Sequence, residues 1–296
     1  GYATTGMISV VIGAIANIVL DPFFIFVLHL DIRGAAIATV LSQCLSAGFV
    51  LYFLSKKAEF KIHLLYKEEI RHCGKDAKNI VSLGAAGFVM QLTNSLVSIC
   101  CNNILAATGG DVYISVMTII SSVRQMIETP IWSISEGSSP VISYNYGAKR
   151  PKKVIEAWIT MSVLALIYSL IAWSVILFAP KFLIGIFSSD KSLMIDTVPA
   201  MKLYFAAFIF MLFQYTGQTM FKSLNKKKQA IFFSILRKVI IVVPLTYIFP
   251  YVFHMGSNGV FMAEPVSNVI GGSLCFIVML LTVLPELKRM NPDLSI

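Results

Sequence analysis

Long apolar stretches alternate with short polar segments along the whole chain. A helix needs about 20 apolar residues to cross the hydrocarbon core of a bilayer. Eight low-charge stretches approach that length, and none alternates with period two as a barrel strand would. We therefore predict an all-α, polytopic membrane protein with eight transmembrane helices, at 7–28, 34–54, 80–106, 112–143, 155–178, 199–221, 236–253 and 259–284.

Two of these spans carry charges. The fourth contains Arg124, Glu128 and Glu136, together with Pro130, which predicts a kink. The seventh is the weakest prediction, because it is short and has Arg237 and Lys238 near one end.

The composition agrees with a membrane protein. Hydrophobic residues make up 57% of the chain and charged residues 13%, against roughly 45–50% and about 25% in soluble domains. The mean hydropathy is +0.78. These values disfavour a soluble enzyme, a disordered tail and a nucleic-acid binder, and they make the lipid bilayer the expected environment.

The net charge of +9 is unevenly distributed over the predicted loops. If the first span runs outward, seventeen Lys and Arg residues lie in 55–79, 144–154, 222–235 and the tail after 285. Only three lie in the alternate loops 29–33, 107–111, 179–198 and 254–258. By the positive-inside rule, the basic loops and the carboxy terminus are cytoplasmic. The positive charge therefore indicates orientation in the cytoplasmic membrane and needs no polyanionic partner.

The first two spans resemble the last two. A displacement of 225 residues gives six identities in about twenty positions. The pairs are Phe24 and Phe249, Val27 and Val252, His29 and His254, Gly34 and Gly259, Ala38 and Ala263, and Ser42 and Ser267.

This repeat predicts a longer protein of two six-helix lobes, parallel in the membrane. Residues 1–55 would be the last two helices of an amino-terminal lobe, and 56–79 a basic cytoplasmic linker. Residues 80–296 would be the carboxy-terminal lobe and its cytoplasmic tail. The chain opens at Gly1 without a methionine or a signal-peptide pattern, so we expect four upstream helices in fewer than about 200 residues.

An ionisable residue inside a membrane span is a candidate for function, and Asp21 is the first of these. Asn17 shares its helix face, and Pro22 leaves the carbonyl of Ile18 without its usual donor. These oxygens suit a proton or a small hard cation, which we favour over an Asp that is merely satisfied by neighbouring helices. Thr39 on the second span could add its hydroxyl, or could bond to its own helix.

A second group of polar residues predicts a substrate cavity. Arg124 and Glu128 share a helix face, and a structural salt bridge is the simpler interpretation of them. Glu264 could likewise face a cavity or serve helix packing, whereas hydration explains Glu136. The candidate cavity residues are Met90, Gln91, Asn94, Arg124, Glu128 and Glu264.

Enzyme motifs are lacking in the sequence, which has no P-loop, no HExxH, no GxSxG and no Cys/His cluster. We expect no catalytic residue, no metal site and no cofactor. Without a nucleotide site, transport would draw on an ion gradient.

Five collinear segments resemble the multidrug and toxin extrusion (MATE) family. They are NIVLDPFFIF at 17–26, GAAIAT at 34–39, MQLTNSL at 90–96, SYNYGAKR at 143–150 and GVFMAEP at 259–265. The resemblance implies twelve helices in two lobes, of which this chain would hold helices five to twelve. It also implies a monomeric antiporter that exports organic, often cationic, molecules by alternating access, driven by protons or sodium ions.

The resemblance also suggests where the coupling ion binds. One branch of the family binds the ion with an Asp on helix one and with an Asn, an Asp and a Thr that match Asn17, Asp21 and Thr39. The helix-one Asp has no counterpart in this chain. Another branch uses acidic residues on helices seven and ten, where this chain has Asn94 and an uncharged run from Leu203 to Phe221. We therefore place coupling in the amino-terminal lobe and leave open a contribution from Glu128 or Glu264.

Two alternatives remain. A flippase or exporter for lipid-linked oligosaccharides or polysaccharides would share the fold, but should have more basic residues in its cavity than Arg124 alone. An intramembrane enzyme or a channel would need a catalytic dyad or a pore-lining repeat, and the sequence shows neither.

Overall fold

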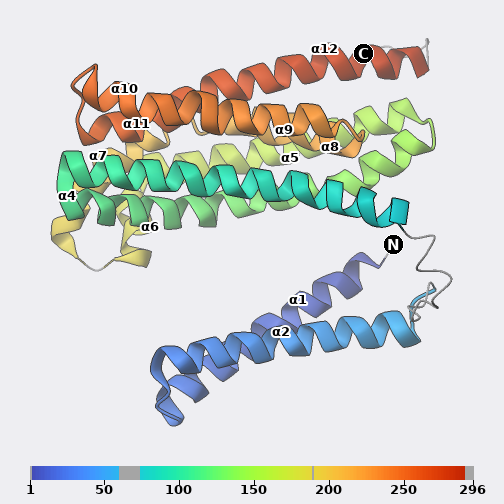
Figure 1. Ribbon diagram of the computed structural model, residues 1–296, viewed down its shortest axis with the longest axis horizontal. Helices are drawn as coiled ribbons and strands as arrows, with labels where there is room; N and C mark the ends of the chain where they lie inside the picture. Colours follow the sequence, from blue (N-terminus) through green and yellow to red (C-terminus); the bar gives the residue numbers. More distant parts are fainter. Residues whose placement is uncertain (1, 60–73, 189, 291–296) are drawn as a thin grey trace. The chain divides into compact units, whose positions relative to one another are not determined.

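The computed structural model describes residues 2–59, 74–188 and 190–290, and every regular element among them is a helix (Figure 1). The predicted all-α fold is confirmed. The chain divides into two compact units, Gly1–Ala77 and Lys78–Ile296.

The first unit is a pair of helices. Helix α1 spans Ala3–Pro22 and continues as the π-helix η1 over Phe23–Val27, while α2 spans Asp31–Lys56. The buried residues of α2 are Gly34, Ala38 and Ser42, which form a stripe at every fourth position. Because these side chains are small, the two backbones approach closely.

The long helix α4 spans Gly74–Gly147, lies in the second unit from Lys78 onward, and is broken at Gly110. Gly110 has φ 70° and ψ −167°, lies in the predicted loop 107–111, and separates the third predicted span from the fourth. The later elements are α5 Pro151–Phe178, α6 Pro180–Phe187, α7 Lys191–Tyr204, α8 Phe210–Ser223, α9 Lys227–Ile235, η2 Leu236–Val242, α10 Val243–Tyr251, α11 Ser257–Ser267, η3 Asn268–Gly272 and α12 Ser273–Met290.

Six helices of the described residues are long and apolar enough to cross a membrane. They are Thr4–Val27, Asp31–Lys56, Gln91–Gly147, Pro151–Phe178, Lys227–Tyr251 and Ser257–Met290. Gln91–Gly147 has 57 residues and contains the break at Gly110, so it is long enough for two crossings. The chain is thus a multi-pass helical membrane protein.

Two predicted spans differ from the structure. The span 199–221 is two helices of 14 residues each, because α7 ends at Tyr204 and α8 begins at Phe210. The span predicted to begin at 236 begins at Lys227, because the lysines at 227 and 228 belong to the helix end and not to a loop. Arg237 and Lys238 consequently lie near the middle of a 25-residue span.

Helix α8 lies at the centre of the second unit, where it packs against α5, α9, α12 and η3. Ten of its fourteen residues are buried, including Met211, Met220 and Phe221. Within a bilayer such contacts stabilise the bundle through close packing rather than through removal from water.

The sequence repeat is confirmed in the hydrogen bonds of the backbone. In the first unit the N–H of Leu30 donates to the carbonyl of Phe24 at 3.1 Å. In the second unit the N–H of Met255 donates to the carbonyl of Phe249 at 3.1 Å. Both pairs are related by the displacement of 225 residues.

The turns that these hydrogen bonds close also match in backbone conformation. His29 and His254 have positive φ values of 50° and 54°. A Cβ atom at Gly34 would lie 2.8 Å from the carbonyl oxygen of Phe24, and one at Gly259 would lie 2.7 Å from a backbone nitrogen. Each turn therefore returns the chain so closely that only glycine fits.

Candidate functional site

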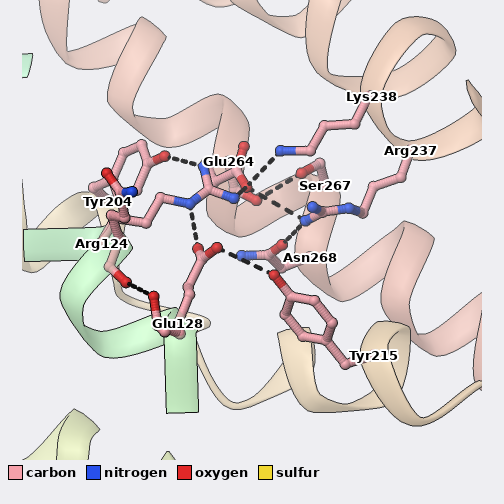
Figure 2. Close-up of polar contacts among 11 residues, drawn as sticks. Arg124, Glu128, Tyr204, Tyr215, Arg237, Lys238, Glu264, Ser267 and Asn268 are labelled. Carbon is pink, nitrogen blue, oxygen red and sulfur yellow. Dashed lines mark hydrogen bonds and ion pairs between the residues drawn. The ribbon is translucent and has the colours of Figure 1, made fainter. Parts of the chain in front are cut away.

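A cavity of about 550 Å³ lies within the second unit. Its wall includes charged and aromatic side chains from α4, α7, α8, η2 and α11 (Figure 2). These residues are Arg124, Glu128, Trp132, Tyr204, Tyr215, Arg237, Lys238 and Glu264. Charged groups deep in a membrane bundle are costly unless they are paired, so their contacts determine what the cavity can bind.

Glu128 uses both of its carboxylate oxygens. Arg124, one helical turn earlier on α4, donates from Nε to Oε1 of Glu128. Tyr215 on α8 donates its hydroxyl to Oε2 at 3.2 Å. Arg124 also donates from Nη1 to the hydroxyl of Tyr204 at 2.5 Å. The predicted Arg124–Glu128 salt bridge is confirmed. Its hydrogen bonds with Tyr204 and Tyr215 join α4 to α7 and α8.

Glu264 on α11 receives three cations at one oxygen (Figure 2). Its Oε1 lies 3.0 Å from Nη2 of Arg124, 3.3 Å from Nη1 of Arg237 and 3.5 Å from Nζ of Lys238. The residue is buried, with 4% of its surface exposed. Because ion pairs in a low-dielectric interior are poorly screened, this carboxylate holds the charge cluster together.

The π-helices give Arg237 and Lys238 their orientation. Both belong to η2, and a π turn carries an extra residue that changes which side chains share a face. Two successive residues thereby reach the same carboxylate, although neighbours on an α-helix point about 100° apart. Arg237 also donates to Oδ1 of Asn268, which begins the facing π-helix η3.

Gly271 in η3 leaves room for the stem of Arg237. A Cβ atom at this position would lie 2.7 Å from Cγ of Arg237 and 3.0 Å from its Cβ. We expect Gly271→Ala to displace the arginine and to lower the free energy of unfolding by about 1–3 kcal/mol. Thermal unfolding of the purified protein measures this. In α6, Gly185→Ala is the control, because nothing lies within 4 Å of the added atom; equal melting temperatures would contradict the prediction.

The structure brings most predicted cavity residues together. The cavity is lined by Gln91, Asn94, Arg124, Glu128 and Glu264. Met90 lies on α4, but its side chain is outside the described residues. Glu136, which we expected to be hydrated, pairs with Lys222 at 2.7 Å where both side chains are about one-third exposed.

The predicted ion-site residues lie in the first unit. Asn17 donates from Nδ2 to Oδ1 of Asp21 at 3.3 Å, and both residues are half-buried. Thr39 is exposed, and its hydroxyl donates to the carbonyl of Ala35 at 2.9 Å. The structure therefore pairs Asn17 with Asp21, whereas the hydroxyl of Thr39 donates its hydrogen bond to the backbone of its own helix.

Sequence reasoning missed the basic side of the cavity. It treated Arg237 and Lys238 as residues of a helix end and counted Arg124 as the only clear cation. Two adjacent basic residues inside an apolar stretch are a signal in themselves. A span that begins at Lys227 places both residues among the intramembrane charges.

Comparison with known proteins identifies the family. The family model described as MatE matches residues 86–248, more than half of the chain. The chain belongs to the MatE family. It is 26% identical over 300 residues to the multidrug export protein MepA of Staphylococcus aureus (strain NCTC 8325 / PS 47), covering 100% of this chain and 63% of the relative. It is also 26% identical over 196 residues to MepA of Staphylococcus haemolyticus (strain JCSC1435), covering 66% of this chain and 42% of the relative.

Solved MATE structures share the fold of this MatE chain. One, a crystal structure of MATE in the bent conformation, has a TM-score of 0.83 at 23% identity and covers 99% of this chain and 64% of the other. Another, an outward-facing MATE multidrug resistance transporter of the MOP superfamily, has a TM-score of 0.84 at 23% identity and covers 96% and 63%. The chain thus spans less than two-thirds of the length of these relatives.

Proposed function

We propose that the full-length protein is a multidrug exporter that moves small organic molecules out across the cytoplasmic membrane by alternating access. The observation that carries the proposal is the cavity in the second unit of a MatE-family chain. Its volume of about 550 Å³ falls in the range of small-molecule sites, roughly 300–1,000 Å³. The MepA relatives, named as multidrug export proteins, support the same function.

The cavity wall would hold a substrate by several kinds of contact. Trp132, Tyr204 and Tyr215 offer aromatic surface, while Gln91 and Asn94 offer amide groups. Aromatic faces accept varied ring systems with little geometric demand, and amides can donate or accept hydrogen bonds. Such a wall suits chemically diverse substrates rather than a single one.

Energy would come from a proton or sodium gradient through Asp21. Its pairing with Asn17 supports this assignment, because it places an amide beside the carboxylate and the two groups together carry three oxygens that can bind a cation. Thr39 retains the lone pairs of its hydroxyl oxygen for a cation, even though it donates its hydrogen to Ala35. Ion and substrate would then oppose each other, since a ligand shifts the equilibrium only by its differential affinity for the two states.

The proposed topology follows the distribution of basic residues. The segments with most Lys and Arg face the cytoplasm, and so does the carboxy terminus. We propose a monomer without a cofactor, which exchanges the coupling ion for an organic substrate.

Extrusion of fluorescent compounds tests this function. Cells that express the full-length protein should extrude ethidium or norfloxacin faster than control cells. Collapse of the proton or sodium gradient with an ionophore should abolish the difference. Extrusion that persists without either gradient would contradict antiport, and absence of any extrusion would contradict export.

A lipid-linked saccharide flippase gains some support from the structure, because Arg237 and Lys238 join Arg124 at the cavity. Glu128 and Glu264 neutralise two of these three cations, however, and a pyrophosphate carries more than one negative charge. Movement of a fluorescent lipid-linked pyrophosphate, but not of ethidium or norfloxacin, would favour the flippase.

A further inference from the structure

We propose that the cavity selects substrates that carry one negative charge, with a carboxylate held at Lys238 and an aromatic body against the cavity wall. This inference rests on the proposed function, in which the cavity is the substrate site. It concerns the charge of the substrate, which the proposed function leaves open.

The charge balance of the cavity is the first observation. Its lining carries three cations, Arg124, Arg237 and Lys238, and two carboxylates, Glu128 and Glu264. The run from Asn79 to Gly110 contributes no charge, because its sequence holds no Asp, Glu, Lys or Arg. The described cavity therefore has one positive charge in excess.

The contacts indicate where that excess lies. Arg124 has Glu128, Glu264 and Tyr204 as partners, and Arg237 has Glu264 and Asn268. Lys238 contacts Glu264 at 3.5 Å, the longest of the three approaches to an oxygen that both arginines share. An ammonium group has three hydrogens to donate, so Lys238 is the cation best able to accept a further anion.

Electrostatics then favours one sign of ligand. An uncompensated charge in a bundle surrounded by lipid is costly, and an incoming anion reduces this cost. An incoming cation would instead be repelled by the excess positive charge. A carboxylate brings the total to zero, whereas a pyrophosphate would leave an excess of negative charge.

The remaining residues of the cavity wall determine which substrate shape fits beside the carboxylate. Trp132, Tyr204 and Tyr215 line the same cavity as Lys238, together with Val242 and Val260. These side chains suit an aromatic or aliphatic body attached to the carboxylate. The chemical class is an amphipathic organic acid with one carboxylate.

A matched set of probes separates charge from shape. Dansylglycine, dansylamide and dansylcadaverine share one fluorophore and are anionic, neutral and cationic near pH 7. Binding to the purified full-length protein is measured by fluorescence, and export by cells that express it. We expect the affinity and the export rate to fall in the order dansylglycine, dansylamide, dansylcadaverine.

Lys238→Met tests the residue directly. It leaves two cations and two carboxylates, so the cavity becomes neutral and the fold should be retained. We expect dansylglycine to bind about tenfold more weakly or worse, as for loss of a hydrogen bond between charged groups. Dansylcadaverine should bind more tightly, which structural damage would not cause. Lys238→Arg should restore dansylglycine binding, and Lys152→Met, at an exposed position at the start of α5, is the matched control.

The outcomes distinguish this inference from the proposed function. Export of dansylcadaverine in preference to dansylglycine would overturn the anion site and leave the exporter standing. Dansylglycine binding that depends on Lys238, without export of any probe, would support the site and overturn the exporter. Unchanged dansylglycine binding in Lys238→Met would overturn the assignment of the carboxylate to that lysine.

Discussion

Asp21→Asn is expected to abolish gradient-driven export by the full-length protein. Asn is nearly isosteric with Asp, but its amide neither takes up a proton near neutral pH nor carries a negative charge to attract a cation. One elementary charge that crosses 100 mV supplies about 2.3 kcal/mol, enough to sustain a substrate gradient of about 50-fold. The variant should sustain none. Norfloxacin accumulation in energised vesicles measures this effect.

Asp31→Asn is the matched control for Asp21→Asn. Asp31 is exposed, begins α2 in the same unit and has φ 46°, a conformation that Asn tolerates. The Asp31→Asn protein should export substrate at the rate of the unmodified protein. The Asp21→Asn protein should still bind norfloxacin, since the substrate cavity lies in the second unit. Retained gradient-dependent export in Asp21→Asn would show that coupling resides elsewhere, with Glu128 and Glu264 as the next carboxylates to test.

Glu264→Gln is expected to cause the largest loss of stability. The substitution leaves the buried Arg237 and Lys238 and the partly buried Arg124 around a neutral amide, and it removes the anion that links α4, η2 and α11. Breaking a buried ion pair from one side costs about 3–5 kcal/mol. The melting temperature of the purified protein and its yield in membranes measure the change.

A surface pair supplies the control for Glu264→Gln. Glu156 lies 2.9 Å from Lys153, and both side chains are more than 60% exposed. Glu156→Gln should therefore cost less than about 1 kcal/mol. Equal melting temperatures for the two variants would contradict a central role of Glu264 in the charge network.

The fold was largely predictable because membrane helices leave a simple pattern. Apolar runs of sufficient length gave the all-α class, and the 225-residue repeat anticipated the matching turns at His29 and His254. The break between Tyr204 and Phe210 was not predictable in this way, because its residues are as apolar as those of the helices on either side.

The site was only partly predictable, because its contacts join distant parts of the chain. The i, i+4 rule gave the Arg124–Glu128 pair from local spacing alone. The contact of Arg124 with Tyr204 spans 80 residues, and that of Arg237 with Asn268 spans 31 and joins two π-helices. Which face a π-helix presents depends on its packing, so the sequence did not indicate that Lys238 and Arg237 share a carboxylate.

Uphill transport by the purified full-length protein in liposomes tests the central claim most directly. With an imposed proton or sodium gradient, external norfloxacin or dansylglycine should accumulate inside vesicles whose transporter is oriented to pump inward. The accumulation should collapse when an ionophore dissipates the gradient. Equilibration of the compound without accumulation would contradict a cation-coupled exporter. Accumulation that depends on neither the proton gradient nor the sodium gradient would contradict it as well.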